Sequence, residues 1–309
     1  MYPVDLTTHI AGMTLRNPVL TSSGTYGFGE EYAAYCPVEA LGGITLKGIT
    51  PLARLGNPVP RLAETPAGLL NSVGLENPGL EEFLKSYLPK VRKLPTAVIA
   101  NISGFSLEDY VQMASALQQD SGLAALEVNI SCPNVKHGGM HFGTDPKSAE
   151  EVIAAVKAVT DLPIIAKLSP NVTDIVGMAQ AVQRGGANAL SLINTLLGMR
   201  IDLDRQRPVL ANTFGGLSGP AIRPVAVRMV WQVSQAVDLP IIGMGGITTW
   251  QDAVEFLLAG ATAVSIGTGN FVNPQAPLEI IQGINNYCEK NGLTSVRELI
   301  GLAQKVLNS

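Results

Sequence analysis

The segment 129–134, which reads Asn-Ile-Ser-Cys-Pro-Asn, holds the residue types best suited to chemistry in this 309-residue chain. The Cys132 thiol lies between the side-chain amides of Asn129 and Asn134 and directly follows an apolar run. Paired amides can fix a flat polar substrate, and a thiol beside it can act as a nucleophile or a proton-transfer base. The segment by itself fits a buried cysteine before a turn equally well, because free cysteine is usually a small core residue.

Polar side chains also end several other short apolar runs. Lys47 and Lys167 end two of them, and Asn101 and Asn194 end two more. A buried lysine without a partner is unstable. Glu127 is the one carboxylate near these ends, and its position within its run leaves the direction it faces open. An anionic ligand is therefore the favoured partner of the lysines, with carboxylate pairing as the alternative.

Two glycine-rich turns indicate a phosphate site. The segments Gly243–Ile247 and Ile266–Gly269 each follow an apolar run and precede a helical pattern. Glycine lets backbone N–H groups approach a ligand closely, and helix N-termini favour anions. Neither turn fits GxGxxG with a following acidic residue, so a dinucleotide fold is not expected. Flavin mononucleotide (FMN) fits the whole set, with its phosphate at the two turns and Lys167 near the N1–C2=O edge of the ring.

The elements that must position these residues alternate along the chain. Short runs rich in Val, Ile and Ala predict eight strands, and amphipathic segments between them predict helices. Eight such units favour a (β/α)₈ barrel of the α/β class over an open sheet. The expected strands are Pro18–Thr21, Gly43–Lys47, Thr96–Asn101, Ala124–Ile130, Pro163–Leu168, Ala189–Ile193, Pro240–Gly243 and Ala263–Ile266, and the expected helices include Leu107–Gln119, Ser148–Val159, Asp174–Arg184, Pro224–Ala236 and Trp250–Leu258.

The barrel is expected to carry additions. Residues 4–15 alternate and turn at Gly12, which predicts an N-terminal hairpin that closes the bottom of the barrel. Residues 50–79, 132–146 and 195–219 predict long loops at the C-terminal face of the strands, where barrel enzymes keep their chemistry. Residues 293–307 predict a terminal helix. The pattern shows no linker, so residues 1–309 are expected to form a single FMN-binding domain.

Composition excludes several classes of protein. The net charge of −4 and the lack of basic runs argue against nucleic-acid binding. No apolar stretch is long enough for a membrane span, and the N-terminus does not read as a signal peptide. Cys36, Cys132 and Cys288 are far apart, which argues against a disulfide framework and places the chain in the cytoplasm. His137 and His141 flank a glycine pair that disfavours a helix, so no metal site is expected.

Together, seven segments resemble class 1 dihydroorotate dehydrogenase over essentially the whole chain. A cysteine rather than a serine in the Asn-Ile-Ser-Cys-Pro-Asn motif points to class 1, and Val135–Gly143 is similar to the NAD-linked subclass 1B catalytic subunit. The segments are Lys47-Gly48, Asn71–Leu75, Asn129–Asn134, Lys167–Pro170, Asn194-Thr195, Leu217–Pro220 and Gly243–Ile247.

The resemblance implies a role for each site residue. Cys132 would be the catalytic base that removes a proton from C5 of dihydroorotate while C6 gives up a hydride, on a loop that closes over the substrate. FMN would contact Ser23, Gly24, Lys47, Gly48, Asn101, Asn129, Lys167, Ile193, Gly219, Gly245, Gly246, Gly267 and Thr268. Dihydroorotate would contact Lys47, Asn71, Ser72, Val73, Gly74, Leu75, Asn129, Asn134, Asn194 and Thr195. Because a free thiol has a pKa of about 8.5, turnover is expected to rise with pH.

The resemblance also implies partners. A homodimer of this chain would join an electron-transfer subunit that carries FAD and a [2Fe–2S] cluster, in a heterotetramer that reduces NAD⁺. A fumarate-linked class 1A enzyme is one alternative. Two others follow from the residues: a barrel aldolase that forms a Schiff base on Lys167, and a scaffold subunit without catalysis.

Overall fold

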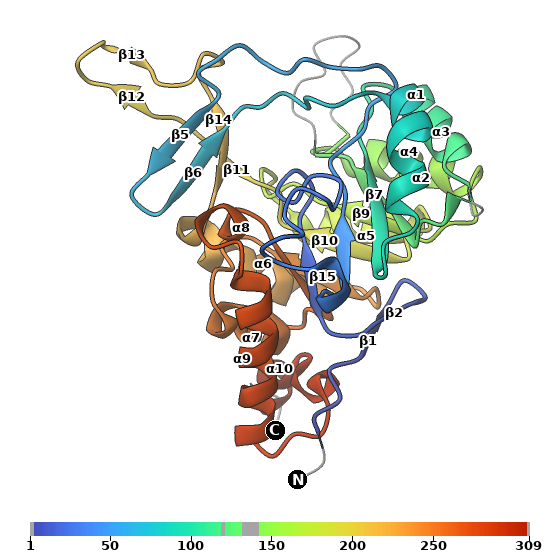
Figure 1. Cartoon of the computed structure of the whole chain (residues 1–309), viewed down its shortest axis with the longest axis vertical. Helices are drawn as coiled ribbons and strands as arrows, with labels where there is room; N and C mark the ends of the chain where they lie inside the picture. Colours follow the sequence, from blue (N-terminus) through green and yellow to red (C-terminus); the bar gives the residue numbers. More distant parts are fainter. Residues whose placement is uncertain (1–2, 119–120, 132–141, 308–309) are drawn as a thin grey trace.

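Eight parallel strands form a closed barrel in the computed structural model, which describes residues 3–118, 121–131 and 142–307 (Figure 1). All eight predicted strands are confirmed, and their ends shift by no more than two residues. The strands are β3 (Val19–Thr21), β4 (Gly43–Thr45), β7 (Ala97–Ile102), β8 (Ala125–Asn129), β9 (Ile164–Lys167), β10 (Ala189–Leu192), β15 (Ile241–Met244) and β16 (Ala263–Ile266). Around the barrel, neighbouring strands are hydrogen-bonded in the order β10-β15-β16-β3-β4-β7-β8-β9.

Prolines mark where two of these strands begin. Pro163 and Pro240 have no backbone N–H, and each precedes its strand by one residue. Their carbonyl groups still take part in the sheet, because the N–H of Leu126 donates to Pro163 at 2.9 Å and the N–H of Leu190 donates to Pro240 at 3.0 Å. The repeated Asp-Leu-Pro-Ile-Ile sequence therefore starts a strand in both places.

Helices cover the outside of the barrel, as the alternating pattern predicts (Figure 1). The five predicted helices are confirmed as α3 (Leu107–Ala116), α4 (Pro146–Lys157), α5 (Ile175–Arg184), α6 (Arg223–Ser234) and α7 (Trp250–Leu258). Further helical segments are η1 (Val38–Ala40), α1 (Leu80–Glu82), η2 (Phe83–Tyr87), α2 (Leu88–Val91), η4 (Pro220–Ile222), α8 (Gly269–Val272) and α9 (Ala276–Lys290).

The N-terminal hairpin closes one end of the barrel, as expected. Strands β1 (Thr8–Ile10) and β2 (Met13–Leu15) pair antiparallel. Ile10, Met13 and Leu15 pack against small and apolar side chains from inside the barrel. Those inward-facing partners are Leu20, Ile99, Ala125, Ile165, Ala189, Ile242, Met244 and Ala263. An apolar layer therefore fills the amino ends of the strands, and on β15 it continues to Met244 at the carboxyl end.

A second layer inside the barrel is polar. Successive side chains of a strand alternate between its faces, so the residues two positions after the apolar layer also point inward. They include Glu127, Lys167, Ser191 and Ser265, all of which are buried. The interior thus changes from apolar to polar toward the carboxyl ends of the strands, which places the polar groups at the predicted site.

The long segments after β4 and β10 contain strands of their own. Strands β5 (Leu62–Thr65), β6 (Gly68–Asn71), β11 (Leu196–Gly198) and β14 (Gly215–Ser218) form an antiparallel sheet in the order β11-β14-β6-β5. A short hairpin of β12 (Ile201–Asp202) and β13 (Arg207–Pro208) extends from it (Figure 1). Residues 50–79 and 195–219 therefore lie at the expected face, but they form a small sheet rather than loops.

The predicted single helix over residues 293–307 is wrong. The segment forms η5 (Val296–Leu299) and the short helix α10 (Leu302–Leu307). Gly301 separates them with a φ of 67°, which is a left-handed conformation that glycine adopts at little cost. The N–H of Gly301 donates to the carbonyl oxygen of Leu257 at the end of α7, at 3.0 Å, and fixes the break against the barrel.

Candidate active site

A cavity of about 610 Å³ opens at the carboxyl ends of the barrel strands, between the barrel and the small sheet. Every predicted site residue that the structure describes lines it. From the barrel side these are Ser23, Gly24, Lys47, Gly48, Asn101, Asn129, Lys167, Ile193, Asn194, Thr195, Gly219, Gly245, Gly246, Gly267 and Thr268. Asn71, Ser72, Val73, Gly74 and Leu75 come from β6 and the segment after it. Cys132 and Asn134 lie outside the described residues, as do His137 and His141.

The cavity also has lining residues for which the sequence analysis predicted no contact with cofactor or substrate. Several of these residues are adjacent in the sequence to predicted site residues, and this adjacency could have indicated that they line the cavity. Others come from the small sheet and could not be placed without it. Polar additions are Ser22, Thr25, Asn57, Ser131, Asn212 and Ser218, and apolar additions include Leu62, Leu69, Leu197, Phe214, Ile222, Met244 and Phe271.

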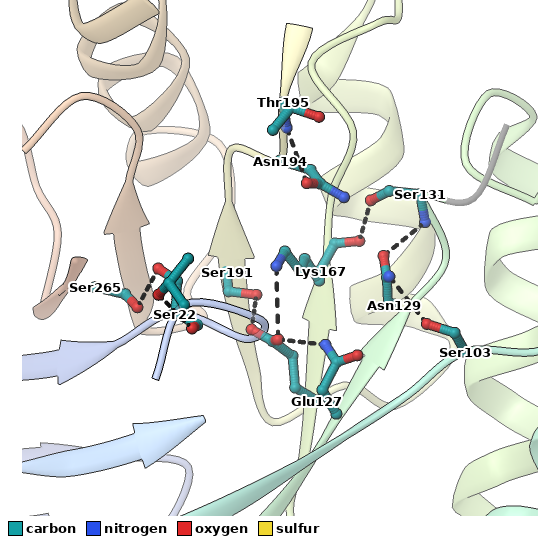
Figure 2. Close-up of polar contacts among 12 residues, drawn as sticks. Ser22, Ser103, Glu127, Asn129, Ser131, Lys167, Ser191, Asn194, Thr195 and Ser265 are labelled. Carbon is teal, nitrogen blue, oxygen red and sulfur yellow. Dashed lines mark hydrogen bonds and ion pairs between the residues drawn. The ribbon is translucent and has the colours of Figure 1, made fainter. Parts of the chain in front are cut away.

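Lys167 has a carboxylate partner inside the barrel, which corrects the expectation that an anionic ligand alone would pair with it. The Nζ atom lies 3.9 Å from Oε2 of Glu127, and both side chains are buried. Glu127 also accepts a hydrogen bond from Ser191 Oγ at 2.8 Å (Figure 2). A second hydrogen bond comes from Asn101 Nδ2 at 2.6 Å. Glu127 faces the same way as Asn129, because residues two apart on a strand share a face.

Lys47 differs from Lys167. It is half-buried in the cavity wall, and it makes no ion pair within the part of the chain that the structure describes. Burial lowers the pKa of Lys47 below its ordinary value of 10.5, while nearby Glu76 acts in the opposite direction. Lys47 therefore presents a cationic group that an anionic ligand can neutralise.

Asn129 is fixed at the end of β8 by three contacts. Its Nδ2 donates to Ser103 Oγ at 3.0 Å, and its Oδ1 accepts from the N–H of Ser131 at 3.2 Å (Figure 2). Its carbonyl oxygen accepts from the Tyr110 hydroxyl at 2.8 Å. Ser131 Oγ in turn donates to the Lys167 carbonyl oxygen at 3.1 Å. The residue before Cys132 is thus anchored between β8 and β9, at the wall of the cavity.

The turns after β15 and β16 offer free backbone donors. Within the described residues, the N–H groups of Gly245, Gly246, Gly267 and Thr268 donate to no other protein group. Gly245 and Gly246 have φ values of 122° and 78°, which other residues rarely adopt. A Cβ on Gly267 would lie in ordinary van der Waals contact with Ser22, no nearer than 3.6 Å. Such a cradle of N–H groups suits a phosphate.

Other residues that line the cavity present amides and a hydroxyl. Asn71 Nδ2 donates to the Gly216 carbonyl oxygen at 3.3 Å, which holds the amide against β14. Asn194 Oδ1 accepts from the N–H of Thr195 at 2.9 Å. Ser72 Oγ is buried and has no hydrogen-bond partner among the described residues. A buried hydroxyl without a partner is unfavourable, and a polar ligand in the cavity would satisfy it.

Comparison with known protein families identifies the family of this chain. The family model for dihydroorotate dehydrogenase matches residues 5–288. The chain belongs to the dihydroorotate dehydrogenase family. The similarity inferred from the seven motifs is thereby confirmed, and the protein is an oxidoreductase of this family.

Several relatives of this family member carry the same name. A protein from Desulforamulus reducens named "Dihydroorotate dehydrogenase B (NAD(+)), catalytic subunit" is 57% identical over 97% of this chain and 99% of its own length. Proteins of the same name from Geobacter sulfurreducens and Bacteroides thetaiotaomicron are 54% and 51% identical, over 97% and 96% of this chain and 99% and 98% of their own lengths. The expected similarity to the NAD-linked catalytic subunits is confirmed.

The fold of the family member agrees with a solved structure. DHODH from Eimeria tenella in complex with ferulenol superposes with a TM-score of 0.83, over 97% of this chain and 89% of that one, at 22% sequence identity. At that identity the likeness supports the (β/α)₈ barrel alone. Among the described residues of this dihydroorotate dehydrogenase, no helix is long and apolar enough to cross a membrane.

Proposed function

We propose that this chain oxidises (S)-dihydroorotate to orotate with bound FMN, as the catalytic subunit of an NAD⁺-linked dihydroorotate dehydrogenase in pyrimidine biosynthesis. One observation carries the proposal: a single cavity at the carboxyl end of the barrel gathers all twenty described residues expected to hold the cofactor and the substrate. Residues 1–309 would act as one FMN-binding domain.

The cavity fits FMN on three grounds. Four backbone N–H groups at Gly245, Gly246, Gly267 and Thr268 are free to receive the phosphate. Lys167 contributes a buried ammonium beside the amides of Asn101 and Asn129. The space over Gly24 is open, because a Cβ there would meet nothing within 4 Å. When bound, FMN supplies a hydride acceptor, which none of the amino-acid side chains can provide.

Substrate binding would use a lysine, amides and a hydroxyl that line the same cavity. Lys47 would pair with the carboxylate of dihydroorotate, since it is cationic and has no ion-pair partner among the described residues. Asn71, Asn129 and Asn194 would hold the ring amides, and the Ser72 hydroxyl would gain the partner it lacks. Each such amide left unpaired in a dry cavity costs about 1–3 kcal/mol, so the same groups would reject analogues without matching polar atoms.

Proton removal from C5 of the substrate is assigned to Cys132. The supporting observation is the position of Ser131, which lines the cavity and is anchored to Asn129 and Lys167. Ser131 directly precedes Cys132 in the sequence. A thiolate close to the substrate can accept the C5 proton while the C6 hydride leaves.

Electrons would pass to NAD⁺ through a partner subunit that carries FAD and a [2Fe–2S] cluster, with this chain as a homodimer inside a heterotetramer. The names of the relatives support the catalytic-subunit role. The described residues hold no cluster of three or more His, Cys, Asp or Glu that could bind a metal. The same names give no support to the fumarate-linked, aldolase or scaffold alternatives.

Anaerobic titration of the purified chain tests the proposal. Dihydroorotate should bleach the flavin absorbance in one step, and addition of the electron-transfer subunit should then allow turnover with NAD⁺ but not with fumarate. Cys132→Ala should retain FMN and lose about 10²–10⁴-fold in the rate of bleaching. A colourless protein, or a Cys132→Ala variant that bleaches at the normal rate, would contradict the proposal.

A further inference from the structure

We propose that Glu127 is a positioning residue that sets how much positive charge Lys167 brings to the flavin. Glu127 lies behind Lys167 in the polar layer of the barrel, is 2% exposed, and does not line the cavity itself. This inference rests on the proposed function, because it concerns the reduction potential of the bound FMN.

Glu127 makes its hydrogen bonds with neutral side chains and its charge interaction with Lys167. Oε1 accepts a hydrogen bond from Ser191 at 2.8 Å (Figure 2). Oε2 accepts one from Asn101 at 2.6 Å, so two neutral donors fix the carboxylate. Lys167 Nζ stays 3.9 Å away, beyond hydrogen-bond distance but close enough for charge attraction. Glu127 thus holds the lysine charge without using its N–H donors.

The Lys167 ammonium is therefore compensated but not hydrogen-bonded. Its Nζ donates no hydrogen bond within the described part of the chain, although the side chain is buried. A buried ammonium with unused donors is unfavourable, and a ligand in the cavity can supply an acceptor. The cavity is the open side of Lys167, so the donors are available to a ring oxygen or nitrogen there.

The signs of the two charges give the direction in which Glu127 shifts the reduction potential. A cation near the flavin stabilises its reduced, negatively charged form and raises the reduction potential. The fixed carboxylate offsets part of that cation, because both charges lie in a buried region of low dielectric. Removing the carboxylate charge should therefore make the potential more positive.

The experiment measures the reduction potential of bound FMN in Glu127→Gln, in Lys167→Met and in the double variant. Glu127→Gln should shift the potential to more positive values, and Lys167→Met to more negative values. In the Lys167→Met background the Glu127→Gln change should have a smaller effect, because Glu127 is proposed to act on the flavin through Lys167. FMN should also raise the melting temperature of Glu127→Gln more than that of the wild type, since the unpaired Lys167 gains a partner on binding.

Glu150→Gln is the matched control. Glu150 pairs with Arg184 at 2.9 Å on the outer surface, so the same chemical change is made away from the cavity and should leave the potential unaltered. If Glu127→Gln does not fold, Glu127→Asp keeps the charge but withdraws it from Lys167, and should give a smaller shift in the same direction.

The outcomes separate this inference from the proposed function. A wild type that binds FMN and is bleached by dihydroorotate, together with an unshifted Glu127→Gln, would overturn the role of Glu127 alone. An equal shift in the Lys167→Met background would also overturn it, because Glu127 would then act without the lysine. A wild type that binds no FMN would overturn both.

Discussion

Thr268 Oγ1 lies 2.6 Å from Ser218 Oγ, which joins the turn after the last barrel strand to strand β14 of the small sheet. Both residues line the cavity. The hydrogen bond therefore connects the turn that would hold the phosphate with the sheet that carries Asn71, one of the amides expected to bind the substrate. The small sheet is part of the site and also shapes the turn that is expected to bind the cofactor.

Thr268→Val tests this connection. Valine keeps the shape of threonine but removes the hydroxyl, so the partly buried Ser218 hydroxyl loses its partner at a cost of about 1 kcal/mol. We expect a fivefold to tenfold rise in the Kd for FMN and little change in fold. Measurement by flavin fluorescence during FMN titration of the apoprotein checks this. Thr294→Val is a control, because the Thr294 hydroxyl is exposed and bonds Glu298 far from the cavity.

Gly246→Ala should destabilise the protein more than Gly12→Ala. The two glycines have nearly equal φ values of 78° and 79°, so the backbone strain of about 1–2 kcal/mol is shared. A Cβ on Gly246 would lie 2.8 Å from the Gly219 carbonyl oxygen, whereas one on Gly12 would meet nothing within 4 Å. Crowding should add about 1–3 kcal/mol at Gly246. Urea unfolding of both variants measures the difference, and equal values would contradict it.

Asp252 should supply stability that is lost in acid. Burial raises the pKa of Asp252, but hydrogen bonds from Thr248 and Thr249 and the charge of Arg223 outweigh it and hold the pKa below 3.8. A lowered carboxyl pKa contributes stability that is present above pH 3.8 and falls away as the pH drops below it. Asp252→Asn should therefore unfold more easily near neutral pH, by about 2 kcal/mol, and show a weaker acid dependence.

Glu255→Gln is the comparison for Asp252. Glu255 pairs with the same Arg223 at 3.3 Å but is exposed, so its loss should cost less than about 1 kcal/mol. Asp252 also caps α7 and holds the turn that follows Gly246, through the N–H groups of Thr248 and Thr249 at 2.9 Å. We expect Asp252→Asn, but not Glu255→Gln, to release FMN more readily on gel filtration.

Orotate binding should weaken at high pH because of Lys47. Burial lowers the pKa of Lys47 below 10.5, so the ammonium is lost at a lower pH in the folded protein than in the unfolded chain. The unfolded state then binds more protons in that window, and the free energy of unfolding without ligand rises as the pH increases toward 10.5. Attraction for the orotate carboxylate falls over the same window.

Titration of orotate against wild type and Lys47→Met at several pH values measures this effect. Lys47→Met should bind orotate weakly, and its affinity should lack the fall at high pH that is due to the lysine. Any titration of orotate itself would appear in both proteins and cancel in the comparison. An identical pH dependence in the two proteins would show that Lys47 does not pair with the carboxylate.

The sequence predicted the barrel because its signals are local. Each strand is a short apolar run, and each of the five predicted helices has its own amphipathic pattern. The small sheet was missed because its pairing is distant: Asn71 on β6 lies opposite Gly216 on β14. The segment Leu80–Val91 was missed too, and Pro89 within it weakens a helical pattern.

Glu127 shows a signal that was present but not used. Asn129 was placed at the cavity, and residues two apart on a strand face the same side, so Glu127 had to face inward. The same spacing relates Ile165 to Lys167, and Ala189 to Ser191. The error over residues 293–307 has a similar source, because Gly301 stands inside the expected helix and marks its break.

The N-terminal hairpin has a consequence for how substrate enters the enzyme and how product leaves it. Ile10, Met13 and Leu15 fill the amino end of the barrel with close-packed apolar groups, whereas the cavity opens at the carboxyl ends of the strands. Within the part of the chain that the structure describes, substrate and product would therefore share the opening of this cavity. A molecule lying across that opening would block both steps at once, which makes the rim formed by Leu197, Phe214 and Phe271 an attractive target for inhibitors.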